Sequence, residues 1–224
     1  KKWKRRRNRR YQKSLRRTRR QKKKRKRTEP KNPTRSSHPL RMRKRRKSKN
    51  NILITGYPGV GKTALVRQVI DELGLNPVGF YTEEIREGGK RAGFRIKSLT
   101  PGLPRMEGIL ARMGLDGPYR RGPYTINIRD MEEVGARALE EALTRRGLIV
   151  IDEIGNMEMV SRRFQEAVID CLDSPRLVLG VIKAESGPFV NRIKPRLDVE
   201  IIELTRERYD EIKSDVMKKI RLRI

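Results

Sequence analysis

The chain has 224 residues, with 57 Lys or Arg against 27 Asp or Glu and a formal net charge of +30. The charge is divided unevenly: residues 1–50 hold 28 Lys or Arg and the single acid Glu29, whereas residues 51–224 have a net charge of only +3. This division excludes a uniformly basic globule and predicts one folded domain over residues 51–224, preceded by a basic extension over residues 1–50.

The scarce residue types exclude further classes. Cys171 is the only cysteine, which rules out an intramolecular disulfide, and the only histidine, His38, lies in the basic extension. No apolar run approaches the roughly 20 residues needed to cross a bilayer, and none follows the basic N-terminus as a secretory signal would require. We therefore expect a cytoplasmic protein without a membrane partner, and a monomer.

The extension comes first in the chain. Residues 1–29 cannot collapse, because like charges repel and only Trp3, Tyr11 and Leu15 are apolar. We expect residues 1–50 to be disordered when free and to bind nucleic acid, RNA being favoured, through salt-dependent phosphate contacts. The aromatic side chains can stack on unpaired bases. The alternative is a solvated tail with no such role.

The rest of the chain alternates short apolar runs with amphipathic stretches. We expect strands at residues 51–55, 78–81, 124–128, 148–151, 177–182 and 199–204. We expect helices at residues 63–73, 130–146, 161–172 and 206–220. Gly88-Gly89 lies between two segments of alternating polar and apolar residues within residues 83–99, which predicts a β-hairpin. Residues 100–123 are rich in Gly, Pro and Arg, which predicts an irregular loop. This order predicts an α/β fold, a mostly parallel sheet with helices on both faces and an inserted hairpin.

A phosphate-binding loop follows the first expected strand. Residues 56–63, GYPGVGKT, match G-x-x-x-x-G-K-[ST] between a strand and an amphipathic helix. Glycines let successive N–H groups face one anion, Lys62 can reach the β- and γ-phosphates, and the Thr63 hydroxyl can bind Mg²⁺. The predicted nucleotide-binding residues are Gly56, Tyr57, Pro58, Gly59, Val60, Gly61, Lys62, Thr63 and Ala64.

Two acids follow the buried strand 148–151. Asp152 lies at its carboxyl end, the edge of an open α/β sheet where ligands bind, and fits a second position that directs Mg²⁺. Glu153 can polarise a water for attack on the γ-phosphate. The pair therefore favours a triphosphatase over a kinase. The alternative is that the two acids only cap a helix that follows the strand.

Four stretches resemble one known family, the small thermophilic nucleoside-triphosphatases, also called cancer-related nucleoside-triphosphatases. They are ITGYPGVGKT (54–63), VGFYTEEIREGGKRAGFRI (78–96), RRGPY (120–124) and IVIDEIGNMEM (149–159). The resemblance covers about residues 51–210 and implies a RecA-like P-loop core and Mg²⁺-dependent hydrolysis of ATP, GTP and other NTPs to the diphosphate. It implies that Asp152 directs the metal and that Glu153 is the catalytic base. The chain departs from the family's pattern at Ala64, at Asn156 and at Arg208-Tyr209.

Other residues have weaker assignments. Charge on the γ-oxygens in the transition state favours an arginine, and Arg120 and Arg196 lie where the resembling family tends to have one; both can equally be surface residues. Lys183 ends a core strand near the expected active edge, where it can sense the γ-phosphate or merely extend to solvent. For Glu84 and Arg86 we favour pairing within the hairpin, and for Phe80, Tyr81 and Phe94 a place in the core.

Three functions stay open at this stage. The first is an NTPase in which water attacks the γ-phosphate. The second is a phosphotransferase in which a nucleoside or polynucleotide hydroxyl replaces that water. The third is an RNA- or ribosome-associated protein whose nucleotide site acts as a switch.

Overall fold

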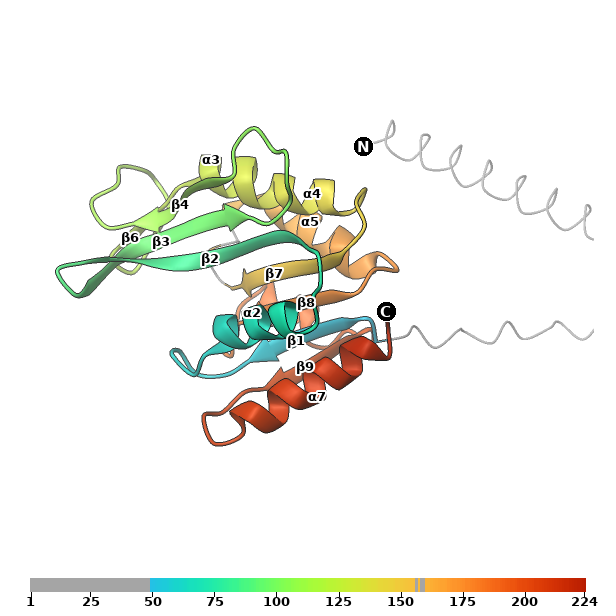
Figure 1. The fold of residues 1–224 in the computed structure, drawn as a ribbon. Helices are drawn as coiled ribbons and strands as arrows, with labels where there is room; N and C mark the ends of the chain where they lie inside the picture. The colour runs from blue at the N-terminus through green and yellow to red at the C-terminus, as the bar shows by residue number, and fades with distance from the viewer. Residues whose placement is uncertain (1–48, 156, 158–159) are drawn as a thin grey trace, which may run out of the picture. The chain divides into compact units, whose positions relative to one another are not determined.

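The computed structural model describes residues 49–155, 157 and 160–224. The predictions for residues 1–48 therefore lie outside the described residues. Within the described residues nine strands form one sheet in the order β5-β6-β4-β3-β2-β7-β8-β1-β9 (Figure 1). The strands are β1 (Asn51–Thr55), β2 (Pro77–Glu87), β3 (Lys90–Ser98), β4 (Glu107–Arg112), β5 (Arg120–Arg121), β6 (Tyr124–Ile126), β7 (Leu148–Ile154), β8 (Val178–Ile182) and β9 (Val199–Glu203).

The sheet has a parallel half and an antiparallel half that share β2. Strands β2, β7, β8, β1 and β9 are parallel to one another. Strands β3, β4, β6 and β5 continue from β2 with antiparallel pairing throughout. The α/β class and the inserted hairpin are confirmed, and the hairpin formed by β2 and β3 begins a larger antiparallel half. The prediction of an irregular loop over residues 100–123 was wrong, because β4 and β5 lie within it.

Helices cover both faces of the sheet. They are α2 (Lys62–Glu72), α3 (Ile128–Asp130), α4 (Arg137–Ala142), α5 (Arg162–Asp173), α6 (Val190–Ile193) and α7 (Tyr209–Arg221), with a π-helical stretch, Met131–Ala136, joining α3 to α4. Two separate cores result, because successive side chains of a strand point to opposite faces. Ile52 and Ile54 of β1 pack with α2 and α7, whereas Leu53 packs with α4 and α5.

The helix boundaries follow from caps that sequence periodicity does not show. The helical segment predicted at residues 130–146 begins at Ile128, where the Asn127 side chain accepts a hydrogen bond from the N–H of Asp130 at 3.1 Å. It ends at Ala142, whose carbonyl accepts a hydrogen bond from Arg176 at 2.9 Å. The Arg176 guanidinium thus binds the end of the helix from the segment before β8. Within the described residues, no helix is long and apolar enough to cross a membrane.

The topology brings two loops to one edge. Because β1 and β7 are parallel and only β8 separates them, the phosphate loop after β1 and the acids at the end of β7 emerge on the same side. The antiparallel half continues the sheet beyond β7. The site therefore has one wall from each half.

Candidate active site

The phosphate loop between β1 and α2 depends on glycines with positive φ. The φ angle is 145° at Gly56, 78° at Gly59 and 97° at Gly61, values that side-chain-bearing residues rarely adopt. At Gly56 an added Cβ would also lie 2.5 Å from the backbone oxygen of Leu204, which follows β9. The path of the loop therefore requires the glycines that the motif supplies.

This loop aims α2 and Lys62 at one cleft. The helix begins at Lys62, and Gly61 before it provides no side-chain cap, so the first N–H groups of α2 are available to an anion. The Lys62 ammonium donates to the carbonyls of Gly56 at 2.9 Å and Tyr57 at 3.1 Å. These bonds hold the lysine at the mouth of the loop, where a phosphate chain can replace them.

Asp152 is the most unusual polar group of this edge. Its residue is 1% exposed, and neither carboxylate oxygen has a hydrogen-bond partner among the described residues. Burial raises the pKa of Asp152 to about 7, although the nearby Thr63 hydroxyl and the cations of Arg67 and Lys62 act to lower it. A buried carboxylate with unused oxygens, next to a hydroxyl and facing a phosphate loop, fits the oxygen ligands that Mg²⁺ takes.

Glu153 faces the cleft beside it. The pairing of β7 with β8 shifts between Asp152 and Ile154, so Glu153 lies at an irregularity of the ladder. Its side chain is 27% exposed and lines the cleft, with its Oε1 3.8 Å from the Lys183 ammonium. Burial raises the pKa of Glu153, while the charges of Lys183 and Lys62 act to lower it. A carboxylate placed this way can accept a proton from a water in the cleft.

The cleft has a volume of about 480 Å³ and two different walls. One wall is the phosphate loop with the start of α2, and the other belongs to the antiparallel half. The residues of this second wall are Thr82, Glu83, Glu84, Arg91, Phe94 and Leu110. The ends of β7 and β8 close the cleft between them, through Glu153, Met157, Lys183, Ala184 and Glu185.

Comparison with known proteins places this geometry in a family. A family model described as "NTPase" matches residues 51–217. The chain belongs to this NTPase family. It is 49% identical over 166 residues to "Nucleoside-triphosphatase THEP1" of Thermotoga sp. (strain RQ2), covering 74% of this chain and 92% of the relative. It is 34% identical to the human "Cancer-related nucleoside-triphosphatase", covering 75% and 94%.

A solved structure of a family member has a similar fold. The crystal structure of THEP1 from Aquifex aeolicus superposes with a TM-score of 0.65 at 37% identity, covering 74% of this chain and 96% of that one. The family and P-loop fold that the sequence motifs indicated are therefore confirmed.

Most residues predicted from the NTPase motifs meet in the cleft. The loop residues Gly56, Pro58, Gly59, Gly61, Lys62, Thr63 and Ala64 line it, as does Glu153. Two members of the predicted loop set do not line it. Tyr57 is 76% exposed, and Val60 packs against the core formed with α2 and α7. Each contributes to the loop through its backbone.

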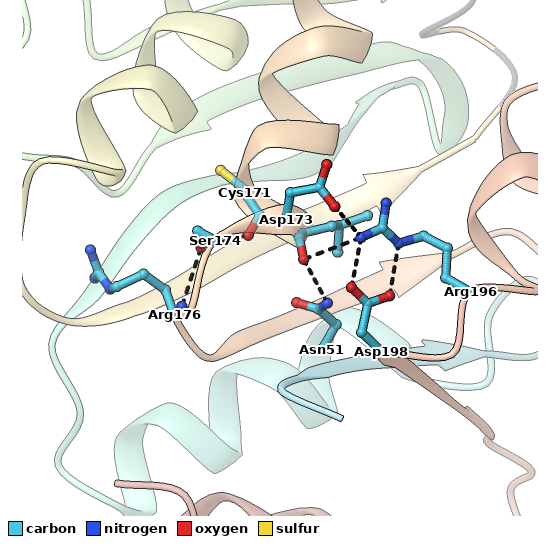
Figure 2. Close-up of polar contacts among 8 residues, drawn as sticks. Asn51, Cys171, Asp173, Ser174, Arg176, Arg196 and Asp198 are labelled. Atoms are coloured by element: carbon cyan, nitrogen blue, oxygen red, sulfur yellow. Dashed lines mark hydrogen bonds and ion pairs between the residues drawn. The ribbon is translucent and has the colours of Figure 1, made fainter. Parts of the chain in front are cut away.

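The structure does not bring the two predicted arginines to the cleft. Arg120 is exposed on β5, at the far edge of the antiparallel half. Arg196 lies at the opposite edge of the parallel strands, where β1 and β9 begin (Figure 2). Its guanidinium pairs with Asp198 at 2.8 Å and Asp173 at 2.6 Å. This geometry gives Arg196 a structural role, joining the end of α5 to the start of β9.

Sequence reasoning missed Arg67, Arg91 and Glu185, which also line the cleft. It assigned Phe94 to the core, and the ring does pack against the core while it also lines the cleft. The signal that could have found Arg91 is its place within residues 78–96, one of the four stretches that carry the family resemblance. Arg67 has a weaker signal: it lies one helical turn after Thr63 in α2, on the side of the cleft.

Ion pairs organise the hairpin wall. Arg67 and Lys97 both contact Glu83 at 2.9 Å, and these two cations hold the pKa of Glu83 below its ordinary value. The Arg67 guanidinium also lies 4.1 Å from the centre of the Tyr81 ring. The Arg67–Glu83 pair thus joins α2, from the phosphate-loop side, to β2 of the hairpin.

Glu84 is the second paired acid of this wall. It binds Arg86 at 2.7 Å and also pairs with Arg91. Burial alone would raise the pKa of Glu84, but Arg91 and Arg86 outweigh it, and the pKa lies below its ordinary value. The prediction that Glu84 and Arg86 pair within the hairpin is therefore confirmed, and Arg91 joins them.

Proposed function

We propose that the protein hydrolyses nucleoside 5′-triphosphates to the diphosphate and phosphate. The observation that carries this proposal is Asp152, buried without a hydrogen-bond partner in the described structure and close to Thr63 and Lys62 of the phosphate loop. Asp152 does not itself line the cleft, whereas its neighbour Glu153 does. The names of the relatives, nucleoside-triphosphatases in each case cited above, support the same reaction class.

The residues of the cleft have separate roles in binding and hydrolysis. The loop N–H groups, the start of α2 and Lys62 bind the β- and γ-phosphates. Thr63 and Asp152 would hold Mg²⁺, which when bound neutralises charge on the phosphate oxygens. Glu153 orients a water and accepts its proton as the water oxygen forms a bond to the γ-phosphorus. The bond from the γ-phosphorus to the bridging oxygen breaks, and that oxygen leaves with the diphosphate.

Several bases are expected to be accepted. The sequence has no N-K-x-D motif that would read guanine, so we propose ATP, GTP and other NTPs as substrates.

The test is phosphate release from ATP, GTP, CTP and UTP, each measured with Mg²⁺ and with the metal removed by EDTA. We expect release from all four, lost on chelation and restored by added Mg²⁺. The Lys62→Met variant should reduce kcat/KM by about 10²- to 10³-fold, because a charge-stabilising donor is removed. Nucleotide binding without phosphate release by the unmodified chain would refute hydrolysis and favour a phosphotransferase or a switch.

We further propose that the basic extension binds RNA. Residues 1–50 hold 28 Lys or Arg against one acid, and phosphate contacts by such a segment release counterions, so binding should weaken steeply with salt. The measurement is the affinity of the full chain and of residues 51–224 for a single-stranded RNA, from 50 to 300 mM salt. Equal affinities of the two chains at low salt would refute this role. Phosphate release with and without RNA would show whether the extension and the cleft are coupled.

A further inference from the structure

Lys183 holds a defined place between the two halves of the catalytic edge. It directly follows β8, the strand that separates β1 with its phosphate loop from β7 with Asp152 and Glu153. Its backbone N–H donates to the carbonyl of Ile154 at 2.9 Å. The backbone of Lys183 is therefore tied to the end of β7 at the level of Glu153.

The side chain of Lys183 lies along a surface that a glycine leaves open. A Cβ added at Gly155 would meet the Lys183 stem at 3.0 Å from Cδ, 3.1 Å from Cε and 3.2 Å from Cγ. The stem thus packs over Gly155, and the ammonium reaches 3.8 Å from Glu153 Oε1 in the cleft. A lysine extending freely to solvent would not need this packing surface.

The other cations that line the cleft have different tasks. Lys62 belongs to the phosphate loop and bonds to its carbonyls. Arg67 and Arg91 pair with Glu83 and Glu84 on the hairpin wall. Within the described part of the cleft, Lys183 is the cation on the side of Glu153, where the attacking water and the γ-phosphate must meet.

We propose that Lys183 is a catalytic residue that binds a non-bridging γ-phosphate oxygen in the transition state. This proposal rests on the proposed hydrolysis. Glu153 accepts the proton of the attacking water while negative charge persists on the γ-oxygens, and the Lys183 ammonium neutralises part of that charge. The lysine keeps its own protons, so it stabilises charge without transferring a proton.

The first experiment compares steady-state hydrolysis of ATP by Lys183→Met, Lys183→Arg and Lys219→Met in the full chain. Methionine keeps an unbranched stem over Gly155 and removes the charge. We expect Lys183→Met to lower kcat by about 10- to 100-fold with little change in KM, and Lys183→Arg to recover most of the loss. Lys219 is the matched control, because its ammonium pairs with Glu200 of β9 at 2.9 Å, away from the residues that line the cleft, and Lys219→Met should retain normal turnover.

The second experiment measures binding of ADP with Mg²⁺, alone and with aluminium fluoride as a mimic of the γ-phosphoryl group in transfer. Lys183→Met should bind ADP normally and the aluminium fluoride complex about 10- to 100-fold more weakly, because the lost contact exists only with the transferring group. The same loss should appear in the Glu153→Gln background. If the loss disappears in that background, Lys183 only positions Glu153, and the proposal is wrong.

The outcomes distinguish a failure of the Lys183 proposal from a failure of the proposed hydrolysis. If the unmodified chain hydrolyses ATP and Lys183→Met matches it in kcat and in aluminium fluoride binding, Lys183 has no catalytic role while hydrolysis stands. If the unmodified chain binds nucleotide and releases no phosphate, the proposed hydrolysis itself fails.

Discussion

The acidic side chains at the two edges of the parallel strands differ in whether they have partners. At the amino edge, the charged groups of Arg196, Asp173 and Asp198 are paired with one another (Figure 2). At the carboxyl edge, neither oxygen of the buried Asp152 carboxylate has a hydrogen-bond partner among the described residues. Each edge also has one neutral oxygen buried without a partner, Asn51 Oδ1 at the amino edge and Thr55 Oγ1 at the carboxyl edge. Burying unsatisfied polar groups costs free energy. The amino edge is therefore organised for stability, and the carboxyl edge for a ligand that completes it.

The largest effect that separates the edges is expected at Glu153. Glu153→Gln keeps the shape of the side chain and removes its ability to take a proton, so kcat should fall by about 10²- to 10⁴-fold. Nucleotide affinity, measured by titration calorimetry with ADP, should change little. The control is Glu166→Gln, which alters an exposed acid paired with Arg162 on α5 and should leave turnover unchanged. Normal phosphate release by Glu153→Gln would show that the base assignment is wrong.

At the amino edge the expected effect is on stability. Arg196→Met removes a guanidinium that is 18% exposed and bonds to Asp198 and Asp173, so the free energy of unfolding should fall by about 2–3 kcal/mol. The measurement is urea denaturation, together with kcat per folded molecule, which should not change. Arg120→Met, on exposed β5, should change neither quantity appreciably. A fall in kcat without a fall in stability would instead place Arg196 in the reaction.

A substitution at Asp152 is expected to raise stability and lower activity, whereas Arg196→Met should lower stability and leave activity unchanged. Asp152→Asn replaces a buried carboxylate whose oxygens accept no hydrogen bond among the described residues with a neutral amide of similar shape, so the free energy of unfolding in EDTA should rise by about 1–2 kcal/mol. Hydrolysis should fall sharply, and Mg²⁺ with ADP should raise the melting temperature of the unmodified chain more than that of the variant. A variant that is less stable in EDTA would mean that Asp152 is satisfied within the fold.

The residues of the carboxyl edge could be predicted from the sequence where their positions depend on neighbouring residues in the chain. Glycines at fixed spacing before Lys62 are required by the φ angles of the loop, and a charged pair after an apolar run identifies the end of a buried strand. These features depend on neighbours in sequence. The phosphate loop and the strand end carrying Asp152 and Glu153 could therefore be recognised before the fold was known.

The hairpin wall and the amino edge depend on partners far apart in the chain. Arg67 meets Glu83 only because α2 packs beside the sheet, and Arg196 reaches Asp173 across 23 residues. β4 escaped prediction because its ladder is completed by β3 and β6, while Gly- and Pro-rich flanks hide its short apolar run. Sequence patterns around a single residue do not contain this information. The family resemblance therefore suggested Arg120 and Arg196 without showing whether the fold brings either of them to the cleft.

The smallest expected effect concerns the ion pairs that join the two walls. The Arg67 and Glu83 side chains are 46% and 33% exposed, so a double-mutant cycle with Arg67→Ala and Glu83→Ala should give a coupling of only about 0.2–1 kcal/mol, lower at high salt. Arg67 and Lys97 lower the pKa of Glu83 from its ordinary value of 4.5, so its contribution is present above that pH and is lost as the pH falls through the lowered pKa. Glu83→Gln should therefore flatten the acid side of the stability profile, measured by urea denaturation between pH 6 and pH 3. A variant profile with the unmodified slope would mean that the carboxylate contributes no charge-dependent stability, and that the two walls are held together by packing alone.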